Sequence, residues 1–573
     1  MPRTDFLGGI THLQAMKVAN NSHAKVICMR PPTTAARDAA TSPAFGRTGR
    51  FGRGVDGLTD LLARHQILFL AVASAVYFWI TVYRAQRRLF WADEIFTYYI
   101  SRLPDLRSVW STSLQGVDFN PPLFYFLTRG MQAVFGANEV GTRFLETLGF
   151  WIFCVCLYRF VASRTNALAG FIALLYPLTC GAYWYAYEAR PQGAVIGFFG
   201  LALVSWQAAA NGTPRRWVAL AGLAASLTCA SLCHAYAFLL FIPLGFGELT
   251  RTLLRRRIDF GVWCALIFPA GVALAAVLPL LRVVHGIPAP VEFGSQLMIL
   301  RLSWEQAINP SLALAILLVL AVPAILPANS GFALDSGKEA EPRWSFAWHE
   351  RAAIAAILLT PVFAFLAARI THAPVYPRYS LIVTGGVAAL IAAECGRRAR
   401  SGLLILAMAL LNIADGAALF AHASVIDEPF TGTLVSTRPP ARTFAWMSAT
   451  APGSEPIAVL EGLSFPPLLH YAPPALRPRM MYLDRSNRGE LYTLAICCGA
   501  PGVEITRRDF LARYRSFFLY GSDSMLLGHV DFFRRIGGKV TDENCDAGQC
   551  LVHLVLPPNP AANEAAALSE KTQ

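Results

Sequence analysis

Asp93 and Glu94 are adjacent acids that directly follow the first long apolar segment of the chain. A carboxylate near a region of low dielectric constant and beside a second carboxylate can have a raised pKa, which suits a general base. The same loop continues through Asp118 and Asn120 into the run Pro121 to Tyr125. The alternative is a pair of solvated loop acids, so the interpretation depends on where this loop lies.

A second polar group follows the third apolar segment, where Tyr187, Glu188 and Arg190 come after a run of aromatic residues. Aromatic residues at the end of a segment are typical of a membrane-interface belt, and Glu188 could simply pair with Arg190. His234, at the end of the fifth segment, fits an ordinary interfacial histidine.

Arg378 lies between Pro377 and Tyr379, just before another apolar segment. Prolines stiffen this turn, and an arginine held there offers fixed, paired donors to a phosphate or another anion. The alternative is an arginine that anchors the chain to lipid headgroups.

The positions of these residues depend on whether the chain crosses a membrane, and its composition indicates that it does. The chain has 573 residues, of which 55% are hydrophobic and 15% charged, with a mean hydropathy of +0.44. Soluble domains carry about 25% charged residues, and a spanning helix needs roughly 20 mostly apolar residues. The sequence therefore predicts an α-helical polytopic membrane protein with eleven spans, at 66–84, 141–160, 166–183, 193–210, 217–233, 236–250, 259–281, 311–327, 351–370, 380–395 and 402–420.

The charge pattern orients these spans. The net charge of +13 could suggest nucleic acid, but the basic residues sit in short loops between spans. With the N-terminus in the cytoplasm, they follow the positive-inside rule. The clusters that decide this are Arg47/Arg50/Arg53/Arg64, Arg159/Arg164, Arg215/Arg216, Arg251/Arg255/Arg256/Arg257 and Arg397/Arg398/Arg400. Arg84, Arg87 and Arg88 run against the pattern. We therefore expect no nucleic-acid partner, and an external first loop at 85–140 whose helix Leu123–Phe135 lies in the interface.

The regions outside the membrane differ in composition. Residues 1–60 predict a disordered basic tail without a signal peptide. Residues 421–557 contain β-rich runs that alternate with helical patterns, which predicts a small extracytoplasmic α/β domain. The expected strands are Ile457–Leu460, Leu491–Ile496, Phe517–Tyr520 and Leu551–Leu556, and the expected helices are Arg507–Tyr514 and Ser524–Arg535. Residues 558–573 predict a second disordered tail.

Four cysteines lie in the predicted outer domain. Cys545 and Cys550 are close enough in sequence for a local disulfide, which an oxidising exterior permits. A zinc site with Cys497 and Cys498 is the alternative, but no histidine flanks the pairs at ligand spacing.

Four motifs in order now resemble a known family. They are the Asp-Glu pair at Asp93, the Asn-Pro-Pro-Leu-Phe-Tyr run at Asn120, Tyr-Glu-Ala-Arg-Pro at Tyr187 and Pro-Arg-Tyr at Pro377. The series, over residues 66–420, resembles the bacterial branch of the protein O-mannosyltransferase superfamily, which has the GT-C architecture. That branch includes lipid A aminoarabinose transferases and related galacturonosyl and mannosyl transferases. The family usually shows a histidine where this chain has Asn120.

The resemblance implies a glycosyltransferase at the outer face of a bacterial inner membrane. Its sugar donor would be carried on a polyprenyl phosphate, its acceptor would be a lipid, glycan or protein, and the displacement would invert the anomeric centre. Asp93 would be the base and Glu94 its orienting partner, while Arg190 and Arg378 would contact phosphate. The remaining substrate-binding residues would be Asn120, Tyr187, Glu188 and Tyr379. Some relatives imply a divalent metal at the acids. The sequence itself shows no complete set of metal ligands.

Two other classes of function stay open at this point. A transporter would also have many spans, but it would tend to show inverted repeats and mid-bilayer charges, and no such repeat is visible. A non-catalytic scaffold for envelope assembly would keep the fold without needing Asp93. The sequence does not identify the sugar, the acceptor, the carrier length, the metal requirement, the oligomeric state or the true start codon.

Overall fold

The structure is a computed structural model that describes residues 60–114, 118, 120–285, 293–308, 346–371, 375–395, 440–460, 462, 464–484, 504–546 and 548–558. Several sequence-based assignments lie outside these residues. They are nearly all of the two terminal tails, the spans 311–327 and 402–420, the strand Leu491–Ile496, and Cys497 and Cys498.

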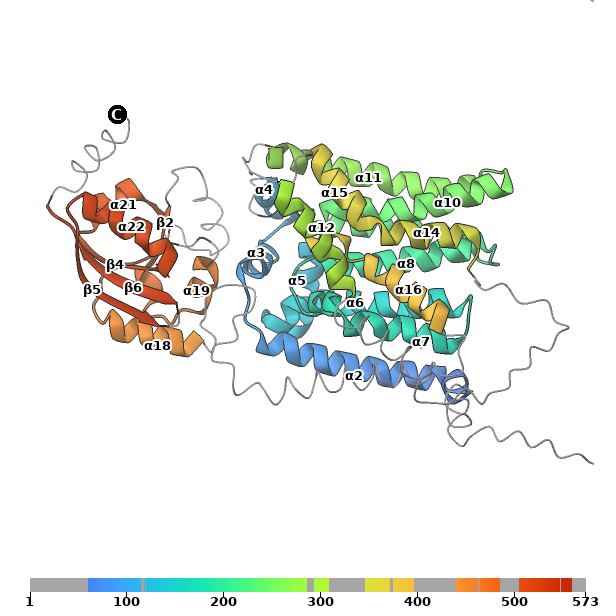
Figure 1. The fold of residues 1–573 in the computed structure, drawn as a ribbon, viewed down its shortest axis with the longest axis horizontal. Coiled ribbons are helices and arrows are strands. Elements are labelled where there is room, and N and C mark those ends of the chain that lie inside the picture. The colour runs from blue at the N-terminus through green and yellow to red at the C-terminus, as the bar shows by residue number, and fades with distance from the viewer. Residues whose placement is uncertain are drawn as a thin grey trace, which may run out of the picture. The chain divides into compact units, whose positions relative to one another are not determined.

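Six described helices are long and apolar enough to cross a membrane: α2 (Gln66–Arg87), α6 (Glu139–Ala162), α8 (Gln192–Ala210), α9 (Arg216–Cys233), η3 with α10 (Ala235–Arg255) and α11 (Phe260–His285). A seventh is obtained if α14 (Trp348–Leu358) and α15 (Thr360–Thr371), which meet at an angle of 56°, are one bent span. Each of these agrees with a segment predicted from hydropathy. They lie side by side in one bundle (Figure 1).

Two predicted spans are shorter than expected. In place of 166–183, α7 (Ala167–Leu175) passes into the 3-10 turns η1 (Tyr176–Thr179) and η2 (Gly181–Ala186). Pro177 lies in the first of these turns and cannot donate the backbone hydrogen bond that a continuing α-helix needs. In place of 380–395, η4 (Pro377–Ser380) precedes α16 (Val383–Cys395). The described residues thus contain six or seven full spans, and the predicted count of eleven is not confirmed, since two of the predicted spans lie outside them.

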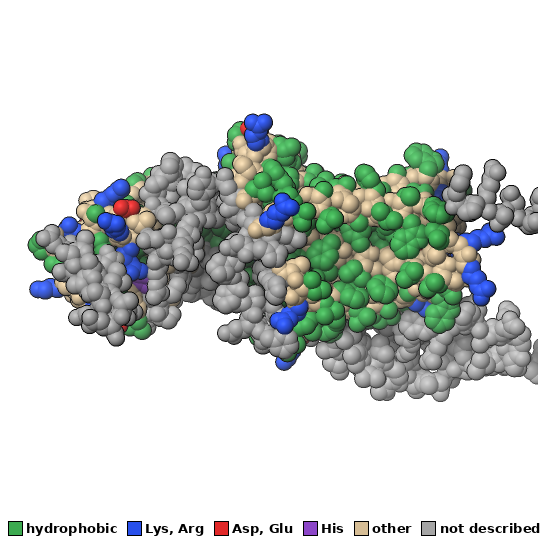
Figure 2. Space-filling view, turned by 90° about the horizontal axis from the view of Figure 1, so that it is seen from above, with side chains coloured by type: hydrophobic (Ala, Val, Ile, Leu, Met, Phe, Trp, Pro, Cys, Tyr) green, Lys and Arg blue, Asp and Glu red, His purple; other side chains and the backbone are tan. Residues whose placement is uncertain are grey.

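The face of the bundle seen in Figure 2 carries hydrophobic side chains over its middle and Lys and Arg side chains toward its ends. Large apolar residues such as Ile67, Trp79 and Phe268 are more than half exposed on these helices. Exposed apolar surface on this scale fits helices surrounded by lipid.

Helices α6 and α8 pack with almost no side chain between them. A Cβ atom at Gly149 would lie 2.6 Å from the Cα atom of Ala194, and one at Gly197 would lie 2.5 Å from the carbonyl oxygen of Gly149. Small residues that let two backbones approach this closely are typical of membrane helix pairs. This packing fixes the start of α8, and with it the segment that carries Glu188 and Arg190.

The loop after α2 folds into three short helices, α3 (Ala92–Ile100), α4 (Leu106–Leu114) and α5 (Leu123–Phe135), and α12 (Phe293–Ile308) follows α11. The bounds of α5 are those expected from the sequence. The C-terminal end of α2 and the N-terminal ends of α3, α6 and α8 meet at one end of the bundle, as hydrogen bonds among them show. The arginine clusters around Arg164, Arg216 and Arg251 lie at the opposite end of the same helices.

The C-terminal region contains a six-stranded sheet in the order β3-β2-β1-β4-β6-β5. Its strands are β1 (Ile457–Val459), β2 (Met480–Asp484), β3 (Glu504–Thr506), β4 (Ser516–Ser522), β5 (Lys539–Asp546) and β6 (Gln549–Val555). Strands β3, β2, β1 and β4 run parallel, whereas β6 and β5 add an antiparallel hairpin. The expected runs at Ile457, Phe517 and Leu551 are therefore strands.

Helices cover both faces of this sheet. Along β4, Phe518 and Tyr520 pack with α18 (Pro440–Thr450) and α19 (Phe465–Tyr471) on one face. Phe517 and Leu519 pack with α21 (Arg507–Arg513) and α22 (Asp523–Arg535) on the other, which is the alternation a strand imposes. A short 3-10 turn, η5 (Arg477–Arg479), precedes β2. Cys545 and Cys550 form the local disulfide across the β5–β6 hairpin.

A candidate active site at one end of the helices

Asp93 lies in the first turn of α3, where two arginines from distant segments converge on it. Its Oδ2 atom is 3.3 Å from Nη2 of Arg378 and 3.7 Å from Nε of Arg190. The side chain is 19% exposed, and no hydrogen bond among the described residues uses Oδ1. Asp93 thus presents one free carboxylate oxygen beside two guanidinium groups.

Glu94 faces away from this opening and is fully buried. Arg143 at the start of α6 holds both carboxylate oxygens in a fork, with Nε to Oε1 and Nη2 to Oε2 each at 2.7 Å. The backbone N–H of Ala189 also donates to Oε1 at 2.7 Å. Burial alone would raise the pKa of Glu94, but the charges of Arg143 and Arg88 hold that pKa below its ordinary value. Glu94 therefore joins α3, α6 and the Glu188–Arg190 segment and does not face the site.

Arg190 is held by a second buried acid, Asp118. Its Nη1 and Nη2 atoms donate to Oδ2 and Oδ1 of Asp118 at 2.7 and 3.2 Å. Tyr125 donates to Oδ2 at 2.7 Å, and Asn120 donates to both oxygens at 3.0 Å. Burial opposes the charged form of Asp118, but Arg190 and these donors lower its pKa overall.

Asn120, which the resemblance implies as a substrate-binding residue, lies beside Asp118 in the structure. The side chain is buried and its amide donates to Asp118. Asn120 thus supports the carboxylate that fixes Arg190.

Tyr187 and Glu188 lie beside the arginines at the end of α2. The guanidinium of Arg88 lies 5.9 Å from the ring centre of Tyr187 and donates to its carbonyl oxygen at 3.5 Å. Glu188 accepts from Trp91 Nε1 at 3.0 Å, while its Oε2 atom is buried with no hydrogen-bond partner in the described residues. Burial raises the pKa of Glu188, although Arg88 offsets part of this effect.

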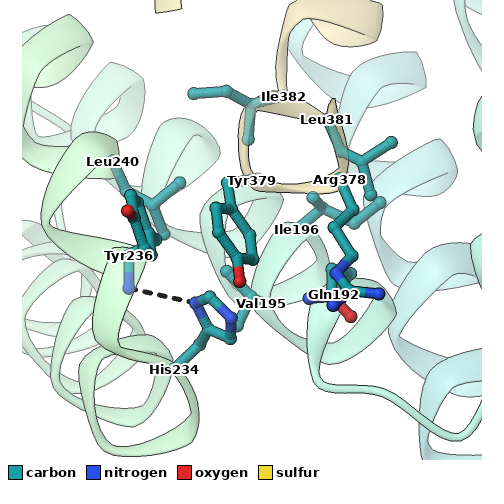
Figure 3. A pocket seen from close by; sticks show the side chains of 10 residues that line it. All are labelled: Gln192, Val195, Ile196, His234, Tyr236, Leu240, Arg378, Tyr379, Leu381 and Ile382. Atoms are coloured by element: carbon teal, nitrogen blue, oxygen red, sulfur yellow. Dashed lines mark hydrogen bonds between the residues drawn. The ribbon is translucent and has the colours of Figure 1, made fainter. Parts of the chain in front are cut away.

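A small pocket lies next to Arg378 (Figure 3). Tyr379 forms one wall, stacked on Tyr236 with ring centres 4.1 Å apart and 5.0 Å from the ring centre of His234. Nδ1 of His234 accepts from the backbone N–H of Tyr236 at 3.0 Å, and burial together with the nearby arginines lowers the pKa of His234 to about 3. The other lining residues are Gln192, Val195, Ile196, Leu240, Leu381 and Ile382.

The structure thus brings together most of the residues selected from the sequence. The guanidinium groups of Arg190 and Arg378 meet the carboxylate of Asp93. The charge of Arg378 also interacts with Glu188 and Tyr379. Two further predicted residues bind the supporting side chains, Glu94 with Arg143 and Asn120 with Asp118. No group of three His, Cys, Asp or Glu side chains within the described part of the chain could hold a metal ion.

Sequence reasoning missed the partners that hold this group together. Asp118 lies two residues before the motif that begins at Asn120. Its acidic side chain was the feature of the sequence that could have identified it as a partner of Arg190. Arg143 lies inside the predicted apolar span 141–160, where a charged residue is itself a signal.

Eight chains among the solved structures are similar to this one, and two of them are structures of the same protein. No family model matches the chain, and no curated protein matches it. The crystal structure of ArnT from Cupriavidus metallidurans in the apo state is 14% identical and has a TM-score of 0.49, covering 85% of this chain and 97% of that one. The structure of the same protein bound to undecaprenyl phosphate is 15% identical with a TM-score of 0.45 and the same coverage.

Proposed function

We propose that this protein is a membrane glycosyltransferase that moves a sugar from a polyprenyl-phosphate carrier to a lipid, glycan or protein acceptor. The observation that carries the proposal is the convergence of Arg190 and Arg378 on the partly exposed carboxylate of Asp93. A base beside two cations at the ends of apolar helices suits a reaction in which a hydroxyl loses a proton and a lipid phosphate departs.

In this reaction Asp93 accepts the proton of the acceptor hydroxyl on its free Oδ1 atom. The acceptor oxygen forms a bond to the anomeric carbon while the bond from that carbon to the phosphate oxygen breaks. The electron pair leaves with the phosphate, where Arg190 and Arg378 stabilise the developing charge. A single displacement of this kind inverts the anomeric centre.

The two arginines differ in how freely they can follow the phosphate. Arg190 is fixed by its fork with Asp118, so it provides a static positive charge. Arg378 donates to Asp93 at 3.3 Å and lies over the rings of Tyr376 and Tyr379, but its Nε atom is buried without a hydrogen-bond partner in the described residues. Arg378 therefore has donors to spare for a lipid phosphate.

A divalent metal fits these residues poorly. The acids nearest the opening already have arginine partners, since Glu94 is held by Arg143 and Asp118 by Arg190. Among the described acids beside the arginines, Asp93 Oδ1 and Glu188 Oε2 are the oxygens left without partners, far fewer than the roughly six to eight oxygen ligands that Ca²⁺ takes. The proposed reaction accordingly uses no metal step.

We further propose that the site faces the outside of the bacterial inner membrane, with the N-terminus in the cytoplasm and the C-terminal α/β domain outside. The support is that Arg164, Arg216 and Arg251 gather at the end of the helices opposite the site, as the positive-inside rule requires of the cytoplasmic end. Reporter fusions after Arg216 should read cytoplasmic, and fusions near Glu490 should read external. A cytoplasmic reading near Glu490 would contradict this orientation.

The proposed activity is tested with purified protein in lipid nanodiscs. We expect transfer from polyprenyl-phosphate hexose, supplied with total envelope lipid and glycan acceptors, to release polyprenyl phosphate and yield a glycosylated product detectable by mass spectrometry. Asp93→Asn is the matched control, and a scaffold would release no carrier with either protein. Release at equal rates from wild type and Asp93→Asn would contradict the proposed role of Asp93.

A further inference from the structure

Gln192 opens α8 and has an amide that the protein leaves unused. Its side chain is only 4% exposed, yet neither Nε2 nor Oε1 has a hydrogen-bond partner within the described part of the chain. A buried amide without partners costs about 1–3 kcal/mol. The side chain lines the pocket beside Arg378 (Figure 3), so its unused donor and acceptor point at a ligand.

The helix start itself does not account for this side chain. The first free N–H groups of α8 are satisfied by Glu146, whose Oε2 accepts from Ala194 at 2.8 Å. Gln192 is therefore not needed as a cap.

The rest of the pocket sets the chemistry of that ligand. His234 is neutral near pH 7, since its pKa lies at about 3, so its ring offers no charge to an anion. The aromatic ring of Tyr379 and the apolar side chains of Val195 and Ile382 form flat, dry walls. The cavity is narrow, because the space open to the centre of a water-sized group is about 20 Å³, enough for one or two such groups.

A hydroxyl is the group that fits these walls. It can donate to the carboxamide oxygen and accept from the carboxamide nitrogen, and it is small and uncharged. A phosphate would find only one cation, Arg378, among the residues that line the cavity.

We propose that Gln192 is a specificity-determining residue that binds a hydroxyl-bearing edge of the donor sugar and thereby selects a hydroxylated sugar over an amino sugar. This inference rests on the proposed function and adds the class of sugar to it. Within the pocket lining Arg378 is the charged side chain, and no carboxylate lies there to receive an ammonium group. The charges of Arg190 and Arg378 each act on His234 more strongly than the opposing charge of Asp118, so a further cation is disfavoured there.

The same helix provides a matched control. Gln207, near the other end of α8, is equally buried but fully bonded. It accepts from Ser163 Oγ at 3.0 Å and donates to the Phe160 carbonyl and to Glu350 at 3.2 and 2.9 Å. Gln207→Leu should lower thermal stability and leave donor preference unchanged, whereas Gln192→Leu should keep or raise thermal stability and change donor preference.

The test measures the KM of nanodisc-embedded protein for polyprenyl-phosphate hexose and for analogues in which one ring hydroxyl at a time is replaced by hydrogen or by an amino group. For wild type we expect one position at which either replacement raises KM about 10- to 100-fold, the range that one buried hydrogen-bonded group gives. Gln192→Leu should raise KM for the hexose by a similar factor and abolish the difference at that position. Gln192→Glu should favour the ammonium analogue.

The possible outcomes distinguish a failure of this inference from a failure of the proposed transferase activity. If wild type discriminates and Gln192→Leu discriminates equally, Gln192 has no role in specificity, while the transferase activity stands. If wild type prefers the amino analogue, the proposed sugar class is wrong. If wild type transfers none of the sugars and binds no polyprenyl phosphate, both the function and the inference fail.

Discussion

The two ends of the helical bundle both bury charged residues, and they differ in how completely those residues are bonded. At the end away from the site, Arg251 donates to Glu248 at 2.9 and 2.7 Å and also contacts Asp259. Trp206 donates to the same glutamate at 3.1 Å. Among the described residues of this end, His349 Nε2 is the one buried side-chain atom without a hydrogen-bond partner.

At the site end, bonded and unbonded groups lie side by side. Glu94 and Asp118 are saturated, but Glu188 Oε2, Arg378 Nε and both amide atoms of Gln192 are buried without partners in the described residues. Leaving such groups unbonded costs stability, so they are expected where a ligand completes the bonding. The difference suggests that one network holds helices together and that the other holds a ligand.

The largest expected effect separates two neighbours within the site. Asp93→Asn keeps the size of the side chain but removes its ability to accept a proton, so turnover should fall by about 10²–10⁴-fold at unchanged thermal stability. Glu94→Gln breaks a buried ion pair and should instead lower the free energy of unfolding by about 3–5 kcal/mol. Turnover per folded molecule and thermal unfolding in detergent measure the two effects. Activity of Asp93→Asn within about threefold of wild type would remove it from the role of base.

The opposite end should respond in stability alone. Arg251 is 3% exposed and Glu248 is fully buried, so Arg251→Ala should cost about 3–5 kcal/mol in unfolding free energy. Arg216→Ala is the milder control, because Arg216 is 38% exposed and its ion pair with Asp259 is screened by solvent. Turnover per folded molecule should match wild type in both variants. If Arg251→Ala lost turnover while its thermal stability stayed at the wild-type value, the proposal that this end of the bundle affects stability alone would be wrong.

Much of this arrangement could be predicted from the sequence, because hydropathy reports directly on helices in lipid. The segments from Gln66, Glu139 and Gln192 were predicted within a few residues of their observed ends. The 166–183 span was predicted too long, since Pro177 breaks the helix where the chain is still apolar. In the sheet, the β-rich composition of Phe517–Tyr520 made it recognisable as a strand.

The site could be predicted only in part, because motifs name residues and not their partners. Asp93, Arg190 and Arg378 were selected, and they converge. The fork between Glu94 and Arg143 joins residues 49 positions apart, and no local pattern encodes that pairing. Long-range pairs of this kind decide which acid is held rigid and which is left free.

Arg378 tests whether the unbonded groups at the site end meet a phosphate. Arg378→Ala should weaken donor binding or turnover by roughly one to two decades, since a charge-assisted contact to an anion is worth about 1.5–3 kcal/mol. Arg378→Lys should recover only part, because an ammonium lacks the planar pair of donors. The measurements are the affinity for polyprenyl phosphate and turnover, both normalised to protein in the membrane. Equal behaviour of the lysine variant and wild type would favour headgroup anchoring and leave Arg190 as the phosphate contact.

The smallest expected effect compares two buried glutamates through the pH dependence of stability. Burial raises the pKa of Glu188 in the folded state, so the folded protein holds this proton more tightly than the unfolded chain does. The stability that Glu188 contributes is therefore fully present below its ordinary pKa of about 4.3 and is lost as the pH rises through the raised folded value. Glu94 has a lowered pKa because Arg143 and Arg88 outweigh its burial, so its contribution is present above about pH 4.3 and is lost as the pH falls.

The two glutamine variants should then differ from wild type in opposite ways. Glu188→Gln keeps an acceptor for Trp91 Nε1 and removes the ionisation, so its thermal stability should gain on wild type as the pH is raised from about 4.3 toward neutrality. Glu94→Gln should lose most against wild type at neutral pH and progressively less as the pH falls. Thermal unfolding in detergent across this pH range measures both differences, and the Glu188 difference should be the smaller because no ion pair is broken. If Glu188→Gln instead lost stability relative to wild type with rising pH, the ionised form of Glu188 would be the one that the folded site favours. Glu188 would then belong with the saturated carboxylates and not with the unbonded groups that a ligand completes.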